Sequence, residues 1–137
     1  MRSALSTAAF ISIVTLAFGC WQTDWPRVVL RTHSVNMRVT YNDKVQRGRT
    51  FQLRKAITLS PEPASRQARY EKKVLKSAIT DSLGLASFGE VEPGIYWITG
   101  GANDIAVTIV PPTGSAERVW VNEFADGCIN AEVERAD

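Results

Sequence analysis

Short apolar segments with turn residues between them recur along the chain. Val35, Met37, Val39 and Tyr41 alternate with polar residues, which is the period-two pattern of a strand that buries one face. Similar segments, rich in β-branched and aromatic residues, follow at Phe51 and Leu53, Ala86 and Phe88, and residues 95–99, 105–110 and 119–124. About seven short strands at this spacing predict an all-β fold, a small immunoglobulin-like β-sandwich.

The chain length of 137 residues suits one such domain. We expect residues 1–19 to be a signal peptide, 20–34 a tether and lead-in, 35–124 the sandwich, and 125–137 a C-terminal strand or tail. Residues 65–76 fit either a short helix capped by a serine or a charged loop, and the sequence does not choose between them.

The first nineteen residues have the pattern of a secretory signal. Arg2 supplies a positive charge, and residues 8–18 form a nearly unbroken apolar stretch. That stretch is shorter than the roughly 20 residues that a membrane-spanning helix needs. Ala17 and Gly19 place small residues three and one before Cys20, as a signal peptidase requires. The sequence therefore predicts an exported protein that is cleaved before Cys20.

Cys20 has two possible fates. Residues 16–20 resemble the lipobox of bacterial lipoproteins, although Ala17 stands where leucine is usual and Phe18 where a small residue is usual. That resemblance implies lipid attachment at Cys20, a membrane anchor in the bacterial cell envelope, and an unpaired Cys128. The alternative is a secreted or periplasmic protein in which Cys20 and Cys128, the only two cysteines, form a disulfide.

Charge is distributed unevenly along the sequence. Residues 27–76 hold thirteen Lys and Arg against three acids, whereas residues 81–137 hold ten acids against two arginines. One interpretation is a basic surface for phosphates, anionic glycans or lipid headgroups. The simpler one is that strands of the two halves alternate and neutralise each other. No basic tract is interleaved with aromatic residues, so we expect no nucleic-acid partner.

Few residues suggest chemistry. His33 is the only histidine, and no motif around Ser34 supports a nucleophile. Because the sequence also lacks a glycine-rich phosphate loop and a metal-binding motif, we expect no catalytic residue, no cofactor and no metal ligand. One set of residues suggests binding, because tryptophans can form a sugar- or peptide-binding face; core packing explains the last two of the set more simply. These tryptophans are Trp21, Trp25, Trp97 and Trp120.

One stretch resembles the carboxypeptidase regulatory-like domains, which are transthyretin-like or prealbumin-like sandwiches. The residues with this spacing are Thr80-Asp81, Gly84, Ala86, Phe88, Val91, Pro93-Gly94, Tyr96 and Ile98. Asp81 is suited to accept hydrogen bonds from its own turn, and Gly84 to adopt a positive φ. Ala86 departs from the family, in which an aromatic residue is usual here.

The resemblance implies a scaffold, since these domains accompany enzymes, transporters or surface proteins as structural or interaction modules. We therefore expect a non-enzymatic envelope lipoprotein with a structural or protein-interaction role, whose partners are the membrane, through its lipid, and other envelope proteins. The alternative is a secreted, disulfide-bonded module that binds an anionic or carbohydrate ligand.

Overall fold

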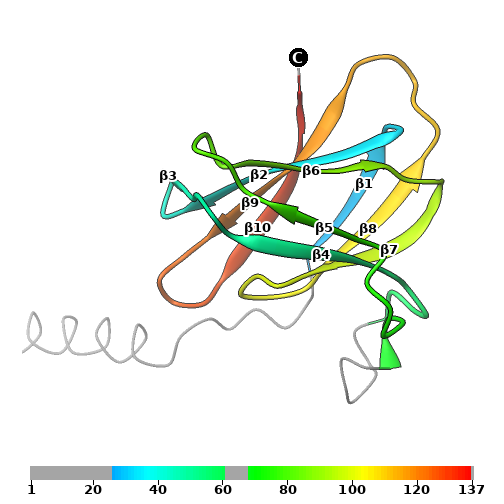
Figure 1. Cartoon of the computed structure of the whole chain (residues 1–137), viewed down its shortest axis with the longest axis horizontal. Helices are drawn as coiled ribbons and strands as arrows, with labels where there is room; N and C mark the ends of the chain where they lie inside the picture. The colour runs from blue at the N-terminus through cyan, green and yellow to red at the C-terminus, as the bar shows by residue number, and fades with distance from the viewer. Residues whose placement is uncertain (1–25, 61–67, 137) are drawn as a thin grey trace, which may run out of the picture.

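The fold consists of two β-sheets that pack face to face (Figure 1). The structure, a computed structural model, describes residues 26–60 and 68–136. Sheet A has the strand order β1 (Arg27–Arg31), β8 (Ile105–Val110), β7 (Gly94–Thr99), β4 (Thr50–Lys55), β5 (Lys76–Ile79). Sheet B has the order β10 (Ile129–Arg135), β9 (Glu117–Glu123), β2 (Ser34–Tyr41), and β2 also pairs with β3 (Lys44–Val45) and β6 (Leu85–Glu90).

The all-β prediction is confirmed for the described residues, where every helix-or-strand element is a strand. The structure has ten strands rather than about seven. The additional strands include β3, which has two residues, and β5, whose polar sequence gave no alternating apolar signal. β1 lies in the range expected to be a tether and lead-in, and β10 in the range expected to be a strand or tail.

Strand pairing joins segments that are distant in sequence. β1 runs parallel to β8, and β2 runs parallel to β9, whereas the other pairs are antiparallel. The chain changes sheet at Thr32 and His33, between β1 and β2. There the Thr32 hydroxyl donates to the carbonyl of Ser34 at 2.9 Å and accepts from its amide at 3.2 Å, which fixes the crossing.

The core fills the space between the inner faces of the two sheets. Val35, Met37 and Val39 of β2 are fully buried, and Phe51 and Leu53 of β4 meet them from sheet A. Ala86 is 7% exposed and lies directly opposite the large Met37 in the β2–β6 pair. Met37 therefore supplies volume beside the small side chain of Ala86.

The turn between β5 and β6 has the geometry expected from its residues. Asp81 accepts hydrogen bonds from the amides of Leu83 at 2.8 Å and Leu85 at 3.0 Å. Gly84 has a φ of +76°, and a Cβ added there would lie 2.7 Å from the carbonyl oxygen of Val39. Only glycine fits that position without displacing β2.

The ambiguous segment 65–76 contains no α-helix where the structure describes it. Residues 68–75 run beside β4, with the amide of Glu71 donating to Lys55 at 3.0 Å and that of Leu75 to Leu53 at 2.9 Å. The helix alternative is therefore wrong for residues 69–75, whereas residue 68 lies in a 3₁₀ turn and 65–67 lie outside the described residues. The expected signal peptide, Cys20, Trp21 and Trp25 lie outside them too.

A candidate interaction surface on sheet B

The outer face of sheet B presents polar side chains in rows across four strands. Because Val35, Met37 and Val39 point into the core, the intervening residues of β2 point outward. Register then places Arg38 between Leu85 of β6 and Trp120 of β9, and Trp120 beside Glu132 of β10. Sequence alternation therefore sets which residues face outward, and strand pairing sets which of them meet.

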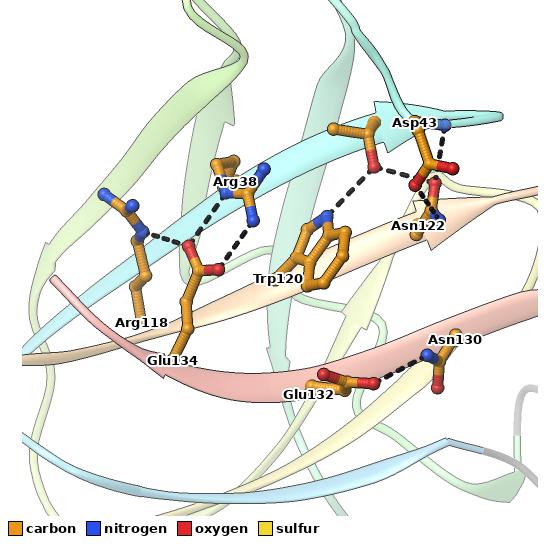
Figure 2. Close-up of polar contacts among 9 residues, drawn as sticks. Arg38, Asp43, Arg118, Trp120, Asn122, Asn130, Glu132 and Glu134 are labelled. Carbon is orange, nitrogen blue, oxygen red and sulfur yellow. Dashed lines mark hydrogen bonds and ion pairs between the residues drawn. The ribbon is translucent and has the colours of Figure 1, made fainter.

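Glu134 binds two arginines on this face (Figure 2). Arg38 donates from Nη2 to Oε1 at 2.6 Å and from Nε to Oε2 at 2.8 Å, while Arg118 Nε donates to Oε2 at 2.5 Å. The hydrogen bond from Arg38 is the largest cause that lowers the pKa of Glu134 to about 2, and Arg118 adds to it against the opposing effect of burial. Glu134 is therefore a carboxylate at any physiological pH.

Trp120 is held at the centre of the same face. The Arg38 guanidinium lies 4.4 Å from the ring centroid, and the indole Nε1 donates to the Thr40 hydroxyl at 2.9 Å. That hydroxyl donates to Asn122 Oδ1 at 2.7 Å, and Asn122 Nδ2 donates to Asp43 Oδ1 at 3.0 Å. The contact of Arg38 with the Trp120 ring joins these hydrogen bonds to the Glu134 triad. We call the joined set the Trp120 network: Arg38, Thr40, Asp43, Arg118, Trp120, Asn122 and Glu134.

The two described tryptophans do not form one binding face. Trp97 is 0% exposed on the outer side of sheet A, where its Nε1 donates to the carbonyl of Thr58 at 2.9 Å and Arg69 lies 5.8 Å from its ring. Trp120 is half-buried on the outer side of sheet B. Core packing, the simpler explanation, therefore holds for Trp97, which is fully buried although it lies outside the cluster between the sheets. It does not hold for the half-buried Trp120.

Charges from the two halves of the sequence pair in space. Arg38 and Arg49 belong to the basic half, and their partners Glu134 and Glu123 belong to the acidic half. Arg49 binds Glu123, which is 3% exposed, at 2.7 and 3.3 Å, and the amide of Ala102 donates to the same carboxylate at 2.7 Å. This pair ties the start of β4 to the end of β9. Basic residues still exposed along β4 and the following segment are Lys55, Lys72, Lys73 and Lys76.

His33 is exposed in the crossing between the sheets, where its carbonyl accepts from the amide of Val91 at 2.9 Å. Within residues 26–60 and 68–136, His, Cys, Asp and Glu side chains form no group of three or more that would suit a metal ion.

Cys128 lies just before β10 and is disulfide-bonded. The chain has one other cysteine, Cys20, which lies outside the described residues.

Most of the Trp120 network was not predicted. Of its members, only Trp120 had been singled out from the sequence. The available signal was weak: polar residues alternate with apolar ones in β2 and β9, as they do in any strand with one solvated face. Arg38 and Glu134 are separated by 96 residues, so their pairing required the sheet order.

Among the described residues, we find no helix with the length and hydropathy to span a bilayer. The chain matches no family model, no curated protein and no solved structure.

Proposed function

We propose that the protein is an exported, non-enzymatic β-sandwich that works as a protein-interaction module of the bacterial cell envelope. The observation that supports this proposal is the Trp120 network on the outer face of sheet B. Its aromatic and charged groups are held in place by one another (Figure 2). Aromatic and arginine side chains that are held rigid are typical anchors of protein interfaces, because little entropy is lost when a partner binds.

We further propose that the sandwich is of the carboxypeptidase regulatory-like type. The support is the turn at Asp81 and Gly84, followed by the turn into Tyr96, whose hydroxyl donates to the carbonyl of Glu92 at 2.7 Å. In this type of domain the sheets act as a scaffold, and the surface determines what is bound.

The two fates of Cys20 lead to different placements in the envelope. A lipid on Cys20 would anchor the module in the membrane, whereas a Cys20–Cys128 disulfide would leave it secreted or periplasmic. The disulfide-bonded state of Cys128 favours the second arrangement, because a thioether on Cys20 leaves no second cysteine in the chain to pair with it. We therefore propose the disulfide-closed form.

The intact mass of the mature protein tests this placement. We expect a chain that starts at Cys20, carries no acyl group, and reacts with a thiol reagent only after reduction. A mass increased by a diacyl or triacyl group would instead assign the protein to the lipoproteins.

The interaction role is tested by site-specific photocrosslinking in the native envelope. A photoreactive residue at Glu132, which is exposed beside Trp120, should give defined adducts. The matched control is the same residue at Ile95, which is 40% exposed on the outer face of sheet A. The adducts at Glu132 should disappear with Trp120→Ala, whereas equal crosslinking from both sheets would argue against a specific surface.

A further inference from the structure

A surface hollow of about 350 Å³ adjoins the Trp120 network on its β6 side. Asn36, Ser87 and Arg118 line it from three neighbouring strands of sheet B. Leu85 of β6, Ile79 at the end of β5 and Asp81 in the turn between these two strands also line it. This volume lies at the lower end of the roughly 300 to 1,000 Å³ of small-molecule sites. A ligand with a short body would fill it.

Three side chains around the hollow have hydrogen-bond donors that no described residue accepts from. Arg118 donates to Glu134 only through Nε, and within the described residues its two terminal nitrogens have no partner; Figure 2 shows them on the side away from Glu134. The Asn36 carbonyl oxygen accepts from Ser34 at 3.5 Å, which leaves its amide group to donate. Ser87 Oγ accepts from the amide of Gly89 at 3.1 Å, which leaves its hydroxyl hydrogen.

The charge at the hollow favours one negative charge on the ligand. Glu134 is a single carboxylate shared by two guanidinium groups, so the triad keeps a net positive charge, and Arg118 presents it to the hollow. The Asp81 carboxylate lies on the opposite wall and opposes a second negative charge. A monoanion therefore fits better than a dianion such as hydrogen phosphate.

The remaining wall is apolar. Ile79 is 64% exposed, and the half-buried Leu85 lies beside it along the hollow. Burial of this exposed surface by a hydrocarbon chain would be favourable. The ligand should thus join a planar anionic head, which matches the arginine fork, to an aliphatic body.

We propose that this hollow binds a small aliphatic monocarboxylate. Its carboxylate would accept from the terminal nitrogens of Arg118, the amide of Asn36 and the hydroxyl of Ser87, and its chain would lie against Leu85 and Ile79. The site extends the proposed interaction surface, and in that sense the inference rests on the proposed function. The ligand class follows from the geometry of the guanidinium fork, the single surplus charge and the apolar wall.

Titration of the mature protein with octanoate, followed by calorimetry and by amide chemical shifts, tests the proposal. We expect a dissociation constant on the order of 1 mM, with shifts at residues 36, 85, 87 and 118. Octanol, which lacks the charge, and inorganic phosphate, which lacks the chain, should each bind at least about tenfold more weakly.

Two variants and a control locate the site. Arg118→Gln should weaken octanoate binding by about tenfold or more, because it removes the charged fork. Asn36→Asp should do the same by placing a carboxylate beside the ligand, and it leaves the Glu134 triad intact. Arg31→Gln, an exposed position on the edge of sheet A, should leave the affinity unchanged.

Equal binding of octanoate and octanol, tighter binding of phosphate than of octanoate, or full affinity in both Arg118→Gln and Asn36→Asp would overturn the proposal. These outcomes are separable from the crosslinking result. If octanoate does not bind but the crosslinks at position 132 are specific, only the carboxylate site is rejected. Octanoate binding without specific crosslinks would reject the protein-interaction role and leave the small-molecule site.

Discussion

Each sheet carries one tryptophan on its outer face, and the two residues differ in what covers them. Trp97 on sheet A lies under the chain segment that follows β4, and no part of it reaches solvent. Trp120 on sheet B lies under the side chain of Arg38 and remains half-buried. A main-chain cover turns an outer face into a second core, whereas a side-chain cover leaves a surface that a partner can reach.

The same difference appears in the ion pairs. The Arg49–Glu123 pair joins the two sheets, and its carboxylate is buried. The Arg38–Glu134 pair lies on the open face of sheet B, with its side chains 28% and 21% exposed. The first pair should therefore act mainly on stability, and the second should mainly order a surface.

The largest effect is expected at Trp97. Trp97→Ala should lower the free energy of unfolding by about 3 to 5 kcal/mol, because it empties a fully enclosed site and leaves the Thr58 carbonyl without its indole donor. Urea unfolding followed by circular dichroism measures this. A loss below about 1 kcal/mol would show that the segment over sheet A collapses onto the space, and the contrast with Trp120 would not hold.

A smaller loss is expected when the pair between the sheets is broken. Glu123→Gln should lower the free energy of unfolding by about 2 kcal/mol, because Arg49 and the Ala102 amide lose a buried charged acceptor. The partial exposure of Arg49 keeps this loss from being larger. Urea unfolding again provides the measurement. The matched control is Glu132→Gln on the open face, and equal losses in the two variants would contradict the distinction between a joining pair and a surface group.

Trp120→Ala should cost only about 1 kcal/mol, the value of one indole hydrogen bond and a partly solvated cation–π contact. Its main consequence should appear in crosslinking, not in stability. If this variant unfolds as readily as Trp97→Ala, Trp120 belongs to the structural core, and the outer face of sheet B loses its main candidate anchor.

The smallest effect concerns pH. The pKa of Glu134 is about 2 in the folded protein and 4.5 for an unperturbed glutamate. The contribution of this carboxylate to the free energy of unfolding is therefore complete above about pH 4.5 and is lost as the pH falls toward 2. With allowance for solvent screening, we expect this contribution to the free energy of unfolding to be about 1 kcal/mol. Glu134→Gln should flatten the stability of the protein over this interval relative to the native chain. If the free energy of unfolding falls equally steeply between pH 5 and 2 in Glu134→Gln and in the native chain, the two arginines do not bind the carboxylate in solution.

Much of sheet B was predictable because its strands follow a simple rule. β2 alternates apolar and polar residues over its length, so both its position and its inward face could be read directly. The turn at Asp81 and Gly84 was predictable for a similar reason, since an aspartate and a glycine at that spacing favour it locally. β5 was missed because its place in sheet A depends on β4 rather than on its own residues.

The sequence alone determined the all-β class, the inward faces of the main strands and the local turns, because each depends on residues within a few positions of one another. Only the tertiary structure decided which outward residues meet. Arg38 forms a hydrogen bond with Glu134, and Trp120 with Thr40, because β9 lies between β2 and β10. Likewise, the burial of Trp97 depends on a segment 39 positions away along the chain. Contacts of that range follow from sheet order, which period-two alternation does not encode.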